Sequence, residues 1–431
     1  MWLSNLTVNK TTLSSIVAGL LLLSASSSEA ASESTANSKP GLRAKRGNGP
    51  CAVDRSHELY ATHPLLCEFL DRLEENVEEV ASEMTEFARE QNLLVGENLN
   101  FDRSKANRGQ PETFSANNDG DDSQLPVVFA HGMGDSCFNS GMIHIGEHTS
   151  ELLGGVYVTC VPTGDSQAED TTNGYFLNMD KSVDVFASKV AEDPKLQNGF
   201  HAIGFSQGNN VIRGYIARYN TPTVHTFVSV NGVNAGEGTV PGCFPKSTGA
   251  ADDDADSDKK EPALGSVCDL LLEQATRRAY TEFAQGHSFQ ANYWRDPRVS
   301  KQEDYYKYSQ LARWNNEGPN NNNQTLNENF AKTSKFVWVM ATQDSMVWPK
   351  EGEHWGCPNN ADGKDPFVWP VLPMSECEWY KEDLFGLQSA SNVFETFEGD
   401  HLRFTMDDFD RWVTTYLSQL SMEATPLEAV E

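Results

Sequence analysis

The residues best suited to chemistry are a serine set between two glycines, in the stretch Gly204-Phe205-Ser206-Gln207-Gly208. This G-x-S-x-G pattern follows an apolar run at 200–203 that predicts a buried strand, and it precedes a segment at 208–219 of helical length and periodicity. A serine on a strand-to-helix turn projects its hydroxyl above the sheet edge, and the glycines permit the tight turn. We therefore predict that Ser206 is a nucleophile. The alternative is a glycine-rich structural turn.

A nucleophilic serine needs a general base, and the base needs an acid that orients it. Asp344 directly follows a predicted strand at 336–340, and His401 follows the last predicted strand, at 392–397. Active residues of open α/β sheets gather at the carboxyl ends of strands, and the chain order Ser, Asp, His is that of α/β-hydrolases. We predict Asp344 as the acid and His401 as the base. Taken singly, Asp344 could be a helix N-cap and His401 a surface residue. Asp400 competes as the acid, but a residue adjacent to His401 is poorly placed for that role.

The oxyanion of a tetrahedral intermediate needs N–H donors aimed at the developing charge. We expect one from the backbone of Gln207, the residue after the nucleophile. The other is expected from Met133, in the glycine-rich loop His131–Asp135 that follows the first predicted strand. His131 could be taken for a second base, although we favour a structural role. None of this chemistry requires a metal or another cofactor.

The elements that must position these residues alternate along the chain. Short apolar runs predict strands, and the stretches between them, such as 181–195 and 208–219, have helical length and periodicity. The predicted strands are 126–130, 155–159, 200–203, 224–230, 336–340 and 392–397. Buried strands that alternate with helices indicate an α/β-hydrolase fold, with a mostly parallel, doubly wound sheet over residues 125–420. An insertion at about 232–333 predicts a helical cap, and its acidic run 251–258 predicts a solvated loop.

The N-terminal part of the chain lies outside this pattern. Residues 1–30 are typical of a secretory signal peptide, since the apolar stretch Ile16–Leu23 precedes small residues up to Ala30. That stretch is shorter than a membrane span; a short anchor or a buried helix is the alternative. Residues 31–63 predict a flexible tail or pro-segment that a dibasic-site protease could cut after Arg46. We expect a protein of the secretory pathway, in a lysosome or vacuole or secreted.

Residues 64–94 predict an amphipathic helix, whose apolar side chains recur at steps of three and four. They are Leu66, Leu70, Leu73, Val77, Val80, Met84 and Phe87. We expect this helix to dock on the catalytic domain or to self-associate, and we favour either over a recognition function. Residues 95–124 predict a polar linker, and 421–431 a C-terminal tail.

Composition limits the partners. A net charge of −29 and a pI near 4.6 argue against binding to nucleic acid or to an anionic membrane surface, which require clustered basic residues. Eight cysteines without C-x-x-C spacing favour disulfides over a zinc or redox site. Pairing of neighbours would give 51–67, 243–268 and 357–377, among many other possible sets. Asn323-Gln324-Thr325 is a glycosylation acceptor in an Asn-rich loop.

Taken together, these motifs resemble those of the palmitoyl-protein thioesterases, lysosomal α/β-hydrolases that remove fatty acyl groups from cysteine. The matching stretches follow the family's order over about residues 125–405. They are His131–Cys137, Asp193–Gln197, Gly204–Gly208, Tyr293–Pro297, Asp344–Val347 and Glu398–Leu402. The resemblance implies the same roles for Ser206, Asp344, His401, Met133 and Gln207. It also implies a Cys243–Cys268 disulfide and glycosylation near Asn323.

Some segments depart from the family. The helix 64–94 and the acidic loop 251–258 lie outside the resemblance. A second family disulfide has no counterpart near Ala187 and Asn220, and the segment Asn231–Gly236 differs from the family's.

The function predicted from the sequence is hydrolysis of thioesters. We expect a serine hydrolase that removes palmitoyl groups from S-acylated cysteine in proteins or peptides, through an acyl-enzyme. Residues 270–314 would supply an apolar groove for the chain, although their aromatic pattern is equally that of ordinary core. Because the same triad cleaves oxygen esters, a secreted lipase or esterase is the alternative. A catalytically silent lipid-binding protein of the same fold is a less favoured one.

Overall fold

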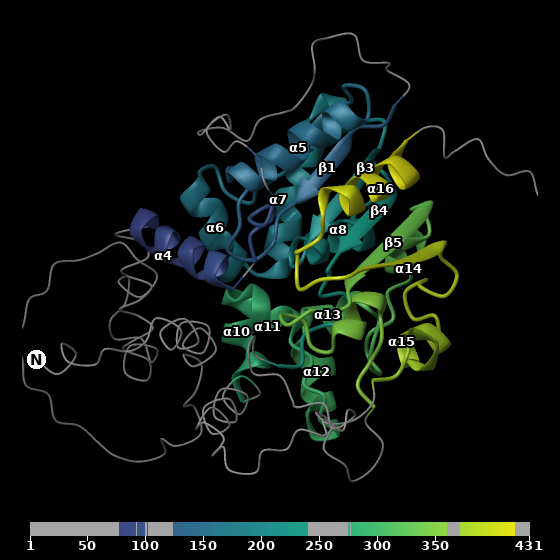
Figure 1. The fold of residues 1–431 in the computed structure, drawn as a ribbon. Helices are drawn as coiled ribbons and strands as arrows, with labels where there is room; N and C mark the ends of the chain where they lie inside the picture. Colours follow the sequence, from purple (N-terminus) through teal and green to yellow (C-terminus); the bar gives the residue numbers. More distant parts are fainter. Residues whose placement is uncertain are drawn as a thin grey trace, which may run out of the picture.

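The structure is a computed structural model that describes residues 77–101, 124–239, 275–359 and 371–418, apart from residues 92, 100 and 276. Its centre is a six-stranded sheet with the order β2-β1-β3-β4-β5-β6, in which every pair of neighbours is parallel (Figure 1). The strands are β1 Val127–Ala130, β2 Val158–Cys160, β3 Phe200–Phe205, β4 Val224–Val230, β5 Lys335–Ala341 and β6 Asn392–Phe397. The predicted fold class is confirmed.

Strand β2 differs from its prediction at 155–159, because it begins only at Val158. Gly154 and Gly155 have φ values of 76° and 92°, a left-handed backbone that cannot continue a ladder. The apolar run therefore starts with a turn, and the extended part extends to Cys160.

Helices cover both faces of the sheet. One face packs on α7 Met179–Glu192, α8 Gly208–Arg218 and α14 Gln324–Phe330, and the other on α5 Ser140–Leu152 and α16 Met406–Leu417. Side chains alternate along the strands: Val128 and Ala202 belong to the core on the α7 and α8 side, and Phe129 and Ile203 to the core on the α5 and α16 side. The chain winds outward from β1 in both directions. This topology places the switch point, where ligands bind in such sheets, between β1 and β3.

The cap inserted between β4 and β5 is a group of short helices (Figure 1). Its described helices are α10 Glu282–His287, α11 Phe289–Tyr293, η2 Val299–Lys301, α12 Gln302–Tyr308 and α13 Gln310–Trp314. The backbone N–H of Met179 donates to Oδ1 of Asn292 over 2.8 Å, which fastens the cap to the start of α7. The remaining short helices are α6 Gln167–Phe176, η1 Pro194–Leu196, η3 Lys350–His354, η4 Met374–Glu376 and α15 Glu378–Lys381. The acidic loop 251–258 lies outside the described residues.

The described part of the predicted N-terminal helix is α4, Val77–Glu90, which lies beside α6 (Figure 1). Val80 and Met84 pack against Tyr175 of α6, so the helix docks on the catalytic domain. Residues 64–76 lie outside the described residues, as do 1–63 and 419–431. No helix in the described ranges is long and apolar enough to cross a membrane.

Helix α4 ends at Glu90, before the predicted end at residue 94, and the chain after it departs from the predicted linker. Val95 and Leu99 are buried, in one cluster with Met142 of α5. A Cβ on Gly141 would lie 1.9 Å from the carbonyl oxygen of Val95, so only glycine allows this close approach. We call residues 93–99 the strap. It packs because Leu93, Leu94, Val95 and Leu99 are apolar, a signal masked by the polar residues that follow.

Two disulfides occur within the described residues. Cys357–Cys377 is one of the three expected neighbour pairs. Cys137–Cys160 was not expected, and it joins the loop after β1 to the end of β2. Its partners meet only because β1 and β2 pair in the sheet, which linear spacing does not reveal. The other four cysteines, including the expected pair Cys243–Cys268, lie outside the described residues.

Candidate active site

Ser206 occupies a strained turn between β3 and α8. Its φ of 51° is in the left-handed region, which a non-glycine residue adopts only where the surrounding structure enforces it. Asn209 enforces it, because its Nδ2 donates to the carbonyl oxygens of Ser206 and Val230, both over 2.9 Å. A Cβ on Gly208 would lie 2.3 Å from the carbonyl oxygen of Ala130. The glycine therefore lets α8 begin directly against the end of β1.

The structure brings Ser206, His401 and Asp344 into one hydrogen-bonded line. His401 Nε2 lies 2.9 Å from Ser206 Oγ, and His401 Nδ1 lies 2.6 Å from Asp344 Oδ2. The backbone N–H groups of Met346 and Val347 donate to Asp344 Oδ1 over 2.7 and 2.8 Å, which fixes the carboxylate plane. All three side chains are buried. This arrangement can activate a serine hydroxyl, with His401 as proton acceptor and Asp344 as its orienting acid.

Asp400, the competing acid, faces elsewhere. Its carboxylate accepts from the backbone N–H and the hydroxyl of Ser345, over 2.8 and 2.9 Å, and from the backbone N–H of His401. Asp344 is the carboxylate that reaches the imidazole ring.

The two expected oxyanion donors flank the serine. A Cβ on Gly132 would lie 3.1 Å from Ser206 Cβ, so the loop after β1 runs directly against the nucleophile. Within the described ranges, neither the Met133 N–H nor the Gln207 N–H donates to another protein group. The Gln207 side chain is held by the cap, because its Oε1 accepts from Gln290 Nε2 over 2.8 Å. Both N–H groups therefore lie beside the β1/β3 switch point without an acceptor among the described residues.

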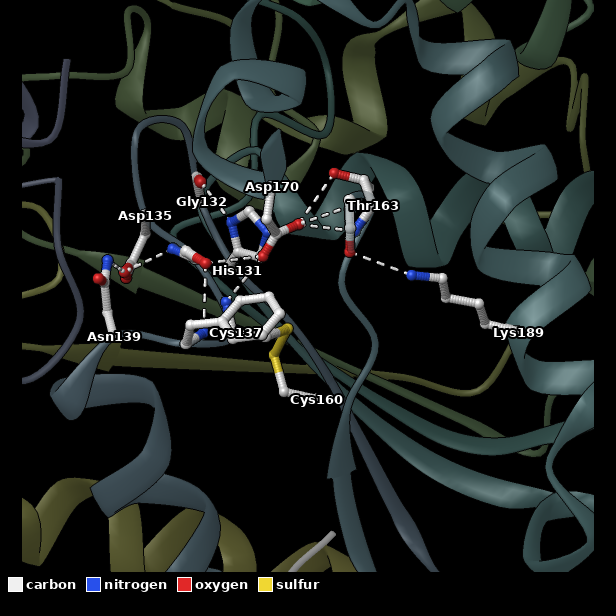
Figure 2. Close-up of a disulfide and its surroundings, with 12 residues drawn as sticks. His131, Gly132, Asp135, Cys137, Asn139, Cys160, Thr163, Asp170 and Lys189 are labelled. Carbon is white, nitrogen blue, oxygen red and sulfur yellow. Dashed lines mark hydrogen bonds and ion pairs between the residues drawn. A yellow bond between two sulfur atoms is a disulfide. The ribbon is translucent and has the colours of Figure 1, made fainter. Parts of the chain in front are cut away.

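His131 supports the loop through contacts with Gly132 and Asp170 (Figure 2). Its Nδ1 lies 2.9 Å from the carbonyl oxygen of Gly132, and its Nε2 lies 3.0 Å from Asp170. Burial alone would lower the pKa of His131, but the Asp170 carboxylate outweighs burial and raises it to about 9. The ring is thus an imidazolium at neutral pH, and both its nitrogens donate. These contacts fit the structural role favoured from the sequence.

Asp170 holds the same loop through further hydrogen bonds. Its Oδ2 accepts from the hydroxyl of Ser136 over 2.9 Å and from the backbone N–H of Cys137 over 3.0 Å. Burial opposes ionisation of Asp170, but the charge of His131 outweighs it and lowers the pKa of the carboxyl group. Asp170 was not predicted from the sequence, since it lies in α6 without any motif.

A second buried carboxyl group, Glu353 of η3, lies behind Asp344. Ligating atoms of Asp344, Glu353 and His401 all lie within 4.8 Å of one another. Burial and the adjacent charge of Asp344 raise the pKa of Glu353 well above its usual value. Burial alone would raise the pKa of Asp344, but the interaction with His401 outweighs burial and lowers that pKa. No sequence signal marked Glu353, because the surrounding residues 350–354 are those of a polar surface turn.

Two clusters in the described ranges hold three potential metal ligands each, and neither offers three available atoms. One contains His131, Cys137 and Asp170, but the Cys137 sulfur is in a disulfide. The other contains Asp344, Glu353 and His401, and there the His401 imidazole is already hydrogen-bonded to the Asp344 carboxylate.

Asn323, the predicted glycosylation acceptor, is exposed and caps α14, since its Oδ1 accepts from the backbone N–H of Thr325 over 3.1 Å. Its glycosylation stays a prediction.

Comparison with known proteins covers the same part of the chain. The profile of the palmitoyl protein thioesterase family matches residues 126–401, from β1 to the predicted base. Palmitoyl-protein thioesterase 1 of Caenorhabditis elegans is 34% identical over 286 residues, which are 65% of this chain and 87% of the relative. Palmitoyl-protein thioesterase 3 of Dictyostelium discoideum is 29% identical, over 61% of this chain and 79% of the relative. Lysosomal thioesterase PPT2 of Mus musculus is 24% identical, over 62% and 77%. Helix α4 and the strap lie outside the family match.

Proposed function

This chain belongs to the palmitoyl protein thioesterase family, and from that premise we propose that it hydrolyses the thioester between a long-chain fatty acyl group, palmitoyl above all, and cysteine in proteins or peptides. The observation that carries the proposal is the line from Ser206 Oγ through His401 to Asp344, with contacts of 2.9 and 2.6 Å. The line lies wholly inside the family match.

The reaction proceeds by two acyl transfers. His401 accepts the Ser206 proton while Oγ attacks the thioester carbonyl, and the oxyanion accepts from the N–H groups of Met133 and Gln207. The C–S bond then breaks, and the cysteine sulfur leaves with the proton that His401 returns. A water molecule next attacks the acyl-enzyme with His401 as base, which releases the fatty acid and restores Ser206.

The leaving group suits this site. A cysteine thiol has a pKa of about 8.5, far below that of an alcohol, so thiolate departure depends less on a proton from His401. The cap reaches the residue after the nucleophile, since the hydroxyl of Tyr293 of α11 donates to Gln207 Oε1 over 3.3 Å, and its apolar residues could therefore hold an acyl chain. Each buried methylene would contribute about 0.8 kcal/mol.

We also propose a lysosomal or secretory location. The predicted signal peptide supports it, as does the mouse relative, which is named a lysosomal thioesterase. The partners are then S-palmitoylated proteins or peptides and other fatty acyl thioesters.

The test compares two substrates that differ in one atom, a palmitoyl peptide linked through cysteine and the same peptide linked through serine. Wild type should favour the thioester, and Ser206→Ala should lower kcat/KM by about a thousandfold or more. Ser188→Ala, at an exposed serine on α7, should match wild type. Cleavage of only the oxygen ester would instead support the lipase or esterase alternative. Full activity in Ser206→Ala would refute the nucleophile.

A further inference from the structure

A second buried carboxyl group lies next to the proposed acid, Asp344. Glu353, fully buried in η3, lies beside it, and both carboxyl groups lie within 4.8 Å of the His401 ring. Two carboxylates that share a water-excluded site cannot both remain ionised at modest cost, so one must hold a proton.

The hydrogen bonds of Glu353 indicate where that proton lies. Its Oε2 accepts from Nδ2 of Asn231 over 2.8 Å and from the backbone N–H of Ala341 over 3.2 Å. Its Oε1 is buried and receives no donor from the described residues. A buried oxygen without a donor is costly unless it carries a proton itself. The group that can accept a hydrogen bond from this proton is the Asp344 carboxylate, which is held ionised by His401 and by two backbone N–H groups.

We propose that Glu353 is a neutral carboxylic acid that donates a hydrogen bond from Oε1 to the Asp344 carboxylate, and that it acts as a positioning residue for the triad. The bond gives the Asp344 carboxylate a partner besides His401 and the two backbone N–H groups. It also draws the negative charge of Asp344 away from the imidazole. This role rests on the proposed function of the triad.

Asn231 connects Glu353 to the other side of the triad. While its Nδ2 donates to Glu353, its Oδ1 accepts from the backbone N–H of Leu402, the residue after His401, over 3.0 Å. Asn231 can do both because it leaves β4 with a φ of 48°. Asn234 adds a bond from Nδ2 to the carbonyl oxygen of Glu353 over 2.8 Å. The side-chain amide of Asn231 thus joins Glu353 to the loop that carries His401.

The charges around Glu353 are few. Asp344 faces it from the loop after β5 and His401 from the loop after β6. Glu237, buried beside the same loop, accepts from the backbone N–H of Trp348, and burial raises its pKa well above the usual value. On η3 itself, Glu351 pairs with Lys350, and His354 turns to the carbonyl oxygens of Trp338 and Glu395. Among the described residues, no lysine or arginine forms an ion pair with either carboxyl group.

Infrared difference spectroscopy of the intact protein tests the protonation directly. Wild type minus Glu353→Gln at neutral pH should show the C=O stretch of a protonated carboxylic acid and no lost carboxylate band. A carboxylate band in place of the acid band would overturn the proposal. Because this readout needs no turnover, it stays decisive even if the thioesterase function fails.

The pH profile of kcat/KM on an S-palmitoylated peptide tests the positioning role. Glutamine can donate from Nε2 and accept at Oε1, so Glu353→Gln should keep the acid limb within about 0.3 pH unit of wild type. Glu353→Met fills the space without a donor, and its acid limb should move up by about one pH unit, because Asp344 then favours the imidazolium more strongly.

Each result decides the proposal. A downward shift of the acid limb in Glu353→Gln would mean that the substitution removed a negative charge. In Glu353→Met, an unmoved acid limb with a lower plateau of kcat/KM would mean that Glu353 has a structural role alone. Either would overturn it. Glu351→Gln is the matched control, since it removes a half-exposed acid from the same short helix and should leave the profile unchanged. If Glu353→Met does not fold, Glu353→Gln and the infrared band still decide the protonation.

Discussion

Removing the Cys137–Cys160 disulfide should damage both stability and catalysis, whereas removing Cys357–Cys377 should damage stability alone. The two bonds close loops of similar length, with sequence separations of 23 and 20 residues. The chain-entropy relation then gives about 3.4 kcal/mol for the first bond and about 3.3 kcal/mol for the second. The Cys137→Ala/Cys160→Ala and Cys357→Ala/Cys377→Ala variants should therefore lose nearly equal stability.

Catalysis separates the two bonds because only one lies at the proposed oxyanion loop (Figure 2). The backbone N–H of Cys137 donates to Asp170, and Asp170 holds His131, which bonds the carbonyl oxygen of Gly132 next to Met133. Once the bond is absent, this loop can shift, and a misplaced oxyanion donor costs about tenfold to a hundredfold in rate. We expect kcat to fall by about tenfold or more in the first variant.

The assay combines urea unfolding with kcat on a palmitoyl thioester, measured well below the unfolding midpoint of both variants. Equal stability losses with a fall in kcat confined to Cys137→Ala/Cys160→Ala would support the reasoning. Equal kcat values in the two variants would refute it, since the disulfide would then have no role in placing the loop.

Three further predictions follow from close contacts and charges. Gly141→Ala should displace the strap, because the added Cβ would meet the Val95 carbonyl oxygen at 1.9 Å. We expect urea unfolding to show a loss of about 1–3 kcal/mol in the free energy of unfolding. Gly286→Ala is the neutral control, since a Cβ there meets nothing within 4 Å. Asn209→Ala should relax the Ser206 turn and lower both kcat and stability, the latter by about 1–3 kcal/mol, because two buried carbonyl oxygens each lose one of their two donors and keep only a backbone N–H. Unchanged kcat would contradict this. The raised pKa of His131 stabilises the fold fully below pH 6.5, and this contribution is lost as the pH rises through about 9; urea titrations should show that loss in wild type and not in His131→Gln.

Much of the fold could be predicted because buried parallel strands are short, apolar and β-branched. Strand β4 begins and ends where the run 224–230 predicts, and Asp344 and His401 were identified by their place after the last two predicted strands. Their meeting with Ser206 follows from strand order alone, since the carboxyl ends of parallel strands share one edge.

The features that were missed depend on tertiary contacts. Cys137 and Cys160 pair because β1 and β2 are neighbours, and nothing in their spacing encodes that pairing. Glu353 lies in a turn whose composition suggests exposure, and only the fold brings it to Asp344. Residues 93–94 of the strap were assigned to the helix and residues 95–99 to a linker, because a glycine at position 141, far along the chain, creates the surface on which the strap packs.

The most direct test of the account is to identify the residue that carries the acyl group during turnover. Wild-type protein is mixed with an S-palmitoylated peptide, quenched in acid within one turnover and digested for mass spectrometry. We predict a palmitoyl ester on Ser206, and longer-lived acyl-enzyme in His401→Gln wherever acylation still occurs. A palmitoyl group on any other residue, or thioester turnover at the wild-type rate by Ser206→Ala, would contradict the central claim.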